Sequence, residues 1–254
     1  MVSLDIAAFH MVENNFFSLV SYRQENFGAV ITFATGDNKA GLNPALVIST
    51  DEFESKLEAC ESFYADKSVP WALLVPDYLM SETVADILGE RAYVFQSEGI
   101  AMVLEAKNAQ HGVANRKLEI REIGHDLATW IIPVSEGFES VPDGCAIYVE
   151  RHAQAMQKPV ANLFHFCGFV DGVPVCSLTL SIKERNARID DVATRPDYQR
   201  NGYASELLVA ALDYAWRSKV EKCFLEASAS GLAVYERLGF QKLFANRYYE
   251  LKQP

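Results

Sequence analysis

The sequence predicts an α/β protein with a mixed β-sheet, divided into two domains. Its 254 residues exceed the roughly 150 of one ordinary domain, and a hydrophobic content of 50% is enough for a buried core. Strand-like apolar runs alternate with segments of helical apolar spacing, which is typical of helices packed on a sheet. The pair Asp171-Gly172 between two apolar runs predicts an antiparallel hairpin, so the sheet is not purely parallel.

The charge of the chain is negative and unevenly distributed. An excess of acidic over basic residues gives a formal net charge of −11. Residues 1–110 contain 6 basic and 16 acidic side chains, a net charge of −10, whereas residues 111–254 have a net charge of −1. This difference indicates two units with different surfaces. The acidic balance also argues against a general nucleic-acid-binding surface, because phosphate backbones need clustered cations.

The first 110 residues are expected to alternate helix and strand. A helix is predicted from about Thr50, because Phe53, Leu57, Cys60 and Tyr64 recur at helical spacing. The other elements expected here are a buried strand over residues 71–76, a helix over 81–88 that ends before Gly89, and a strand over 100–105.

A linker is predicted at residues 107–117, where small and polar residues separate two patterned regions. This boundary divides the chain into an N-terminal domain, residues 1–110, and a C-terminal domain, residues 115–254. In the second domain a long helix begins near Ala204, because its apolar residues keep an i, i+3, i+4, i+7 stripe. The remaining elements expected are strands at 118–123, 163–170, 173–182, 187–194, 223–227 and 241–251, and helices at 127–136, 143–157 and 232–238.

Cysteine, histidine and hydropathy patterns exclude several classes of protein. The five cysteines are odd in number and form no CxxC pair, so we expect reduced core residues in a cytoplasmic protein. The five histidines show no ligand spacing, so no metal is expected. No secretory signal pattern opens the chain, and no apolar run approaches the roughly 18 residues of a membrane span. No contact with a membrane is therefore expected.

The stretch from Gln199 to Ala204 carries the clearest chemical signal. It lies between a predicted strand and a predicted helix, with Gly202 at the turn. A helix N-terminus presents unpaired backbone N–H groups, and a glycine lets an anion approach them closely. We therefore expect a pyrophosphate cradle in an otherwise acidic protein, with Arg200 as the counter-charge and Arg195 or Lys219 as alternatives. The alternative is a glycine turn that only leads into a packed helix.

Residues 189–204, IDDVATRPDYQRNGYA, resemble the acetyl-CoA motif of the GCN5-related N-acetyltransferase (GNAT) superfamily. Residues 235–240, YERLGF, resemble that family's second signature, a tyrosine on a short helix before a Gly-Phe turn. Both occur in the family's order with the expected strand between them, and the resemblance covers about residues 118–254. A dinucleotide-binding fold fits less well, because the loop has one glycine and no βαβ unit precedes it early in the chain. The resemblance implies a GNAT fold for the second domain.

The resemblance also implies roles for individual residues. Tyr235 resembles the general acid that protonates the CoA thiolate, and a purely packing role is its alternative. Ser228 stands where many relatives carry an asparagine that contacts the cofactor. By the resemblance, the pantetheine arm of acetyl-CoA lies along the backbone of Val192, Ala193 and Thr194, and its pyrophosphate lies on the loop of Gln199, Arg200, Asn201, Gly202, Tyr203, Ala204 and Ser205.

The general base is less well determined. Asp190, Asp191 and Glu226 are the carboxylates close to the predicted site. The alternation of side chains along a strand puts Asp190 and Asp191 on opposite faces of the sheet, so only one of them can face the cleft. Asp190 is our candidate base, and a solvated or sheet-edge role is its alternative. In some relatives a glutamate two residues before this position is the base, and Arg188 stands there in this chain.

The N-terminal domain resembles, more weakly, a degenerate copy of the same fold without the glycine loop. The resemblance rests on residues 63–64, 69–71, 87–89 and 102–104. We expect this domain to bind no cofactor and to serve as structure or as part of an acceptor pocket, where its negative charge would attract a cationic amine.

The family resemblance implies acetyl transfer from acetyl-CoA, as co-substrate, to a primary amine of a small molecule or peptide. The transfer needs attack of an unprotonated amine on the thioester, stabilisation of the oxyanion, and a proton for the thiolate. Backbone N–H groups near Val192 are candidates for holding the oxyanion. The competing hypothesis is a non-catalytic CoA-binding or interaction module. The sequence leaves a homodimer open.

Overall fold

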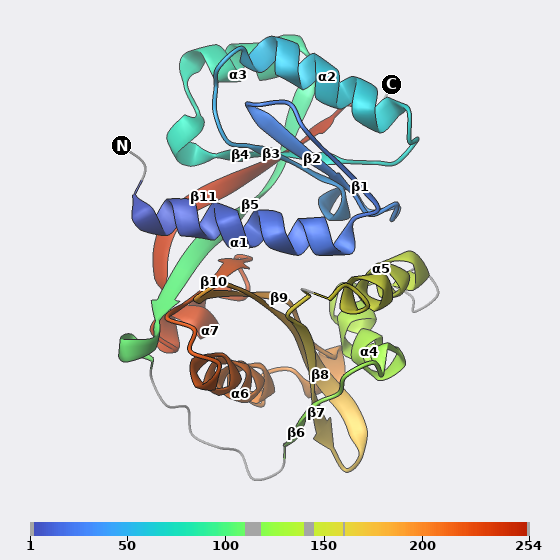
Figure 1. Cartoon of the computed structure of the whole chain (residues 1–254), viewed down its shortest axis with the longest axis vertical. Coiled ribbons are helices and arrows are strands. Elements are labelled where there is room, and N and C mark those ends of the chain that lie inside the picture. Colours follow the sequence, from blue (N-terminus) through green and yellow to red (C-terminus); the bar gives the residue numbers. More distant parts are fainter. Residues whose placement is uncertain (1–2, 110–117, 140–144, 160, 253–254) are drawn as a thin grey trace.

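The computed structural model describes residues 3–109, 118–139, 145–159 and 161–252 (Figure 1). In the first of these segments two helices begin at serine caps: the hydroxyls of Ser3 and Ser81 accept hydrogen bonds from the N–H groups of Ile6 and Val84. The elements of this segment are α1 (Leu4–Val20), β1 (Arg23–Asn26), β2 (Val30–Ala34), η1 (Ala40–Leu42), β3 (Pro44–Val47), α2 (Phe53–Ala65), β4 (Ala72–Pro76), η2 (Asp77–Leu79), α3 (Glu82–Glu90), β5 (Tyr93–Glu105) and η3 (Ala106–Asn108).

The remaining described residues contain a second set of strands and helices. The elements are β6 (Glu119–Glu122), α4 (Leu127–Gly137), α5 (Ala146–Met156), β7 (Leu163–Val170), β8 (Val173–Lys183), β9 (Asn186–Thr194), η5 (Pro196–Tyr198), α6 (Tyr203–Arg217), β10 (Lys222–Ala227), α7 (Leu232–Arg237) and β11 (Gln241–Leu251). Within the described ranges, no helix is both long enough and apolar enough to cross a membrane.

The strands form one sheet in the order β1-β2-β3-β4-β11-β5-β10-β9-β8-β7-β6 (Figure 1). Two neighbouring pairs, β3 with β4 and β9 with β10, are parallel, and each is joined by one crossing helix, α2 or α6. The other neighbouring strands of this sheet pair antiparallel, as β7 does with β8. The predicted α/β class with a mixed sheet is therefore confirmed.

The same order of elements occurs twice around the centre of the sheet. The run β3-α2-β4-α3-β5 has the order of β9-α6-β10-α7-β11, with a parallel pair first and a last strand that pairs antiparallel. The last strands are exchanged, because β11 pairs with β4 and β5 pairs with β10. The sheet is thus continuous across the predicted domain boundary. Residues 110–117 of the predicted linker lie outside the described part of the chain.

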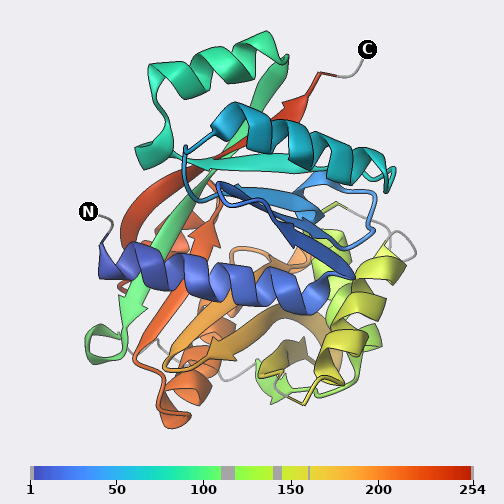
Figure 2. The same cartoon turned by 45° about the horizontal axis from the view of Figure 1, so that its top comes forward.

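Helices cover both faces of the sheet, and α1 crosses its middle (Figures 1 and 2). Apolar residues of α6 pack with β8, β9 and β10 on one face, called the α6 face here. On the opposite face, the α1 face, α1 packs with α4 and α5 and also with β5 and β10. Phe17 of α1 lies 5.7 Å from Phe33 of β2, measured between ring centroids, so α1 contacts both halves of the chain.

Local predictions agree with the structure where the turn chemistry is explicit. The hairpin strands are β7 and β8, with Val170 opposite Val173, and the turn residues Asp171 and Gly172 have φ angles of 50° and 79°. All five cysteines are buried with free thiols, as predicted for core residues. The structure also contains helix α1 and the three strands β1, β2 and β3, which the sequence patterns did not indicate. Strand β5 begins earlier than predicted, at Tyr93.

Candidate active site

The loop between β9 and α6 turns sharply before the helix begins. Gly202 is the N-cap of α6 with a φ of 82°, and Arg200 also has a positive φ, of 62°. A Cβ atom at Gly202 would meet nothing within 4 Å, so the backbone angle favours glycine and the space beside it is open. The first helical hydrogen bond runs from the Glu206 N–H to the Gly202 carbonyl, so the N–H groups of residues 203–205 lie at the helix end, before the helical ladder.

The start of α6 borders a cavity of about 620 Å³, called the α6 cavity below. It brings together residues from four separate segments, namely the end of β9, the loop, the start of α6, and α7 with the turn before it. Ten of the residues singled out from the sequence line it: Val192, Thr194, Gln199, Arg200, Gly202, Tyr203, Ala204, Ser205, Ser228 and Tyr235. The others that line it are Tyr198, Leu208, Ser230, Gly231, Val234 and Arg237.

Two predicted cofactor-binding residues do not line the α6 cavity. The side chain of Ala193 packs on the α1 face, where a Cβ atom on Gly137 of α4 would lie only 2.9 Å from its own Cβ. The side chain of Asn201 donates hydrogen bonds of 3.1 Å to the carbonyls of Tyr198 and Gln199. Any contact of Ala193 with a cofactor would therefore involve its backbone, while the side chain of Asn201 stabilises the shape of the loop.

Tyr235 enters the α6 cavity from α7. Its side chain is buried, and Gly231 one turn earlier makes room for it, because a Cβ there would lie 2.9 Å from its ring carbon Cε2. Burial, and secondarily the nearby charge of Asp190, raises the pKa of the Tyr235 hydroxyl. The hydroxyl therefore keeps its proton at neutral pH, as a proton donor must.

The second wall of the α6 cavity is the end of β9. The parallel pairing of β9 with β10 extends from Asn186 opposite Lys222 to Ile189 opposite Leu225. Beyond Ile189, β9 continues along β8 as far as Thr194. The side chains of Val192 and Thr194 on this last part line the cavity.

A β-bulge interrupts β9 at this point. Thr179 of β8 lies opposite Asp190, and Ser177 lies opposite Ala193, so the pair Asp191 and Val192 faces a single residue of β8. Asp191 has a φ of 56°. The expectation that Asp190 and Asp191 lie on opposite faces is therefore wrong, because the extra residue shifts the alternation and both side chains lie on the α1 face, beside Arg188 and Tyr148.

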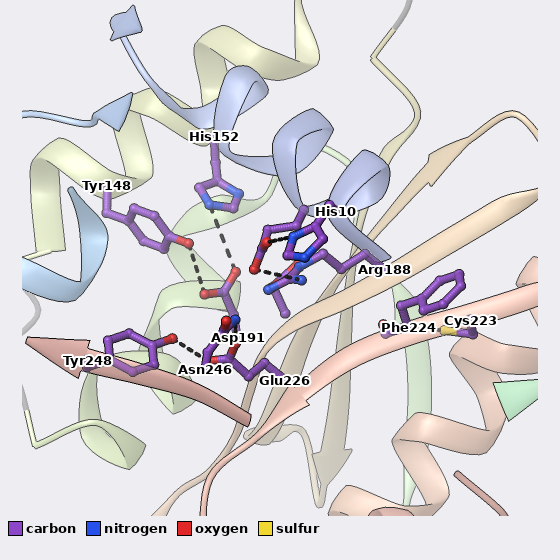
Figure 3. Close-up of polar contacts among 12 residues, drawn as sticks. His10, Tyr148, His152, Arg188, Asp191, Cys223, Phe224, Glu226, Asn246 and Tyr248 are labelled. Carbon is purple, nitrogen blue, oxygen red and sulfur yellow. Dashed lines mark hydrogen bonds and ion pairs between the residues drawn. The ribbon is translucent and has the colours of Figure 1, made fainter. Parts of the chain in front are cut away.

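Asp191 lines a second cavity of about 420 Å³, called the α5 cavity below. The Tyr148 hydroxyl donates a 2.9 Å hydrogen bond to Asp191 Oδ1, and His152 Nε2 lies 3.9 Å from Oδ2 (Figure 3). Burial, followed by the charge of Asp190, raises the pKa of the Asp191 carboxyl to about 7. The residues that line the α5 cavity are Asp37, Lys39, Gly41, Leu42, Val134, Phe138, Cys145, Tyr148 and Asp191.

Asp190 is held in an ion pair and lines neither cavity. Arg188 Nε donates hydrogen bonds of 2.9 and 3.1 Å to the two Asp190 oxygens. The same guanidinium lies 3.6 Å from Glu13 Oε1 of α1, and both of these side chains are buried. Burial raises the pKa of Asp190, while Arg188 acts in the opposite direction. The geometry thus makes Asp190 a partner of Arg188 and leaves it a weak candidate for the base.

Glu226 is also engaged by neighbouring side chains. It accepts a 2.6 Å hydrogen bond from Asn246 Nδ2 and a second hydrogen bond from the Tyr248 hydroxyl (Figure 3). Its side chain lies against Gly99 of β5, where a Cβ atom would collide with it. Of the three carboxylates considered from the sequence, Asp191 lines the α5 cavity, and the other two line neither the α5 cavity nor the α6 cavity.

Several site residues carry no sequence signal. Tyr148 and His152 belong to α5, and Asp37 precedes η1 in the N-terminal half, so the fold alone brings them to β9. His152 and His165 are both buried, and their rings share a 2.8 Å hydrogen bond between Nδ1 and Nε2. Within the described part of the chain, no group of His, Cys, Asp and Glu side chains could hold a metal ion.

In the N-terminal half, a third cavity lies where the α6 cavity lies in the C-terminal half. It lies at the start of α2, with α3 as the counterpart of α7, and its lining includes Glu52 and Glu54. Glu52 is the N-cap of α2 and has a left-handed φ of 50°, as Gly202 has at the start of α6. These two carboxylates would repel the negative charge of a phosphate group bound beside them.

The comparisons place a known domain over the α6 cavity. Residues 132–240 match the family model of the acetyltransferase (GNAT) family. No curated protein matches the chain.

Solved structures share the fold at low sequence identity. A GCN5-related N-acetyltransferase from Kribbella flavida has a TM-score of 0.74 at 15% identity, over 97% of this chain and 96% of that one. A GCN5-related N-acetyltransferase from Sphaerobacter thermophilus has a TM-score of 0.63 at 13% identity, over 87% and 76% of the two chains. A tandem GNAT protein from the clavulanic acid biosynthesis pathway has a TM-score of 0.58 at 12% identity, over 91% and 82%. These similarities show a shared fold that extends into the N-terminal half.

Proposed function

Residues 132–240 are a domain of the acetyltransferase (GNAT) family, and on that premise we propose that the protein transfers an acetyl group from acetyl-CoA to a primary amine. One observation carries the proposal. The α6 cavity joins the glycine turn, the N-terminus of α6 and a protonated tyrosine, while β9 separates it from a second cavity that contains a carboxylate. We therefore place the meeting of the two substrates at this strand, which each would approach from a different face of the sheet.

The residues of the α6 cavity fit the co-substrate. The pyrophosphate would be held by the N–H groups at the start of α6, beside the open space at Gly202, with Arg200 and Arg237 as counter-charges. The backbone of Val192 to Thr194 would pair with the pantetheine arm as an added strand. Ser228 lines the same cavity and offers a hydroxyl.

Two side chains are assigned to proton transfer. The amine nitrogen forms a bond to the thioester carbonyl carbon, backbone N–H groups near Val192 stabilise the oxyanion, and the C–S bond then breaks. Tyr235 gives a proton to the departing thiolate, and the second proton that the nitrogen loses as the amide forms restores the Tyr235 hydroxyl. Asp191, rather than Asp190, takes the proton that the ammonium loses, since it is the carboxylate that lines a cavity.

We propose a separate role for the N-terminal half, residues 1–110. The repeated order of elements supports a degenerate copy of the GNAT fold, and Glu52 and Glu54 at the start of α2 support a half that binds no acetyl-CoA. This half contributes Asp37, Lys39, Gly41 and Leu42 to the α5 cavity, which supports a role in holding the acceptor.

The cofactor assignment is tested by the affinity for CoA, measured calorimetrically on the full chain. A Gly202→Val side chain would occupy the open space beside the turn, so we expect the affinity to fall by about tenfold or more. Gly172→Val is a matched control, because Gly172 has a φ of 79°, also has open space around it, and lies in the β7–β8 turn. Equal CoA affinities for the two variants, both folded, would contradict the assignment. CoA binding with no turnover of any amine would favour the non-catalytic CoA-binding module.

A further inference from the structure

The α5 cavity has an apolar lining and a carboxylate, Asp191, next to the end of β9. Resting on the proposed function, we infer that the acceptor is a small primary amine with an uncharged, apolar body, which binds in the α5 cavity with its ammonium group at Asp191. Arylalkylamines and short alkylamines belong to this class, whereas free amino acids do not.

The position of Asp191 directs an amine toward the thioester. Asp191 and Val192 are consecutive in the bulge, and the first lines the α5 cavity while the second lines the α6 cavity. An ammonium group at the Asp191 carboxylate therefore lies next to the strand along which the acetyl-carrying arm would bind. The body of the acceptor extends away from β9, into the space between α4, α5 and η1.

The walls of that space are largely apolar. Leu42 comes from the N-terminal half, Val134 and Phe138 come from α4, and the ring of Tyr148 comes from α5. A volume of about 420 Å³ is in the range of small-molecule sites. An apolar body gains free energy from contact with these walls, whereas the amide groups of a peptide would lose their hydrogen bonds to water there.

The charges of the α5 cavity favour an acceptor with one ammonium group near β9 and no carboxylate beside it. The neighbours of the Asp191 carboxylate are the uncharged hydroxyls of Tyr148 and Thr179, and His152, which burial keeps neutral by lowering its pKa. The charge of Arg188 also reaches Asp191, but Arg188 is paired with Asp190 and Glu13. The second carboxylate, Asp37, is accompanied by the charge of Lys39. An α-carboxylate next to the acceptor ammonium would be brought close to Asp191 and Asp190, at a cost in electrostatic repulsion.

The wall from the N-terminal half is built as a fixed surface. The Asn43 side chain is fully buried, and its oxygen accepts hydrogen bonds from the N–H groups of Thr35 and Gly36 at 3.0 and 3.2 Å. Its amide donates to the carbonyls of Asp37 and Lys39, which closes the turn that precedes η1. Arg151 Nε of α5 donates a 2.8 Å hydrogen bond to the Thr35 carbonyl, so the turn is tied to the other side of the cavity. A preformed wall of this kind favours shape selection among acceptors.

The inference is tested by kcat/KM for a matched pair of acceptors, phenethylamine and phenylalanine, which share a body and differ by one carboxylate. With the full chain and acetyl-CoA, we expect kcat/KM for phenethylamine to exceed that for phenylalanine by about tenfold or more. Leu42→Arg places a cation in the cavity, so it should lower the value for phenethylamine and reduce the ratio several-fold. Leu251→Arg is the control, because Leu251 is an exposed leucine at the end of β11, and it should leave the ratio unchanged.

The possible results separate the inference from the function on which it rests. Equal rates for the two acceptors, or a ratio that Leu42→Arg leaves unchanged, would overturn the inference while the acetyl transfer itself stands. Transfer to amino acids or peptides alone would overturn it in the same way. Bound acetyl-CoA with no transfer to any amine would instead contradict the proposed function.

Discussion

Asp191 and Val192 are neighbours in the chain, yet their side chains line two different cavities on opposite faces of the sheet. The β-bulge produces this arrangement, because two residues of β9 face one residue of β8. The backbone of these two residues therefore lies between the two cavities. We propose that the amine and the thioester meet at this point of β9.

The pH dependence of turnover should report the Asp191 carboxyl. Burial raises its pKa to about 7, and a base acts only when deprotonated, so kcat should rise with pH through about 7 and then level off. Asp191→Asn removes the base, and we expect kcat to fall about 10²-fold and the rise near pH 7 to disappear. The measurement is kcat at saturating substrates from pH 5.5 to 9.

Asp190→Asn is the comparison for this prediction. Asp190 is paired with Arg188 and lines neither cavity, so its substitution should lower stability and leave the shape of the pH profile in place. If instead Asp190→Asn abolishes the rise and Asp191→Asn retains it, the assignment of the base is reversed.

Tyr235→Phe should separate catalysis from binding. The substitution keeps the buried ring and removes the hydroxyl, so KM for acetyl-CoA should change little while kcat falls about 10²-fold. Tyr214→Phe on α6 is the control. The Tyr214 ring packs on Phe164 and Phe166, and none of these three residues lines the α6 cavity. Full kcat in a Tyr235→Phe protein that melts at the temperature of the unmodified chain would show that Tyr235 only packs.

Sequence patterns predicted those turns of the fold whose conformation depends on the residues of the turn itself. The turn at Gly202 and the hairpin at Asp171-Gly172 need backbone angles that favour glycine, and both occur where the sequence indicated. The bulge in β9 left no such mark, so side-chain alternation wrongly put Asp190 and Asp191 on opposite faces of the sheet. Helix α1 was not indicated because Glu13, which is buried beside Arg188, interrupts its apolar pattern.

Long-range features could not be predicted from the sequence at all. The α5 cavity combines Leu42 with Tyr148 and Asp191, which only the complete sheet brings together. The exchange of β5 and β11 between the two repeats is likewise a property of strand pairing, to which the predicted linker at residues 107–117 gave no clue.

Arg188 should be essential for stability at neutral pH. It is buried with Asp190 and Glu13, and Glu226 also contributes to its electrostatic environment. Arg188→Met leaves these carboxylates without their cation, and we expect a loss of about 3 to 5 kcal/mol in the free energy of unfolding. Burial raises the pKa values of Asp190 and Glu226, so protonation of these two carboxyls should make the loss smaller at pH 5 than at pH 8. Urea unfolding at both pH values measures it, and an equal loss at both would contradict this explanation.

The buried histidine pair should make the fold sensitive to acid. Burial lowers the pKa of His165 to about 3 and lowers that of His152 well below its usual value. Below pH 6.5 the unfolded chain binds protons that the folded chain does not bind, so stability falls by up to about 1.4 kcal/mol per histidine per pH unit. In the double variant His152→Phe with His165→Phe, the free energy of unfolding should fall less between pH 6.5 and 4.5. Parallel pH curves for the variant and the unmodified chain would refute this source of acid sensitivity.

The central claim is acetyl transfer between two cavities that meet at β9, and the most direct measurement is the release of CoA together with the mass of the amine. With the full chain, acetyl-CoA and phenethylamine, the account predicts that each CoA released is matched by one amine that has gained an acetyl group. Omission of the amine should abolish the release. CoA release without an acetylated amine, or no release from a chain that binds acetyl-CoA, would contradict the claim.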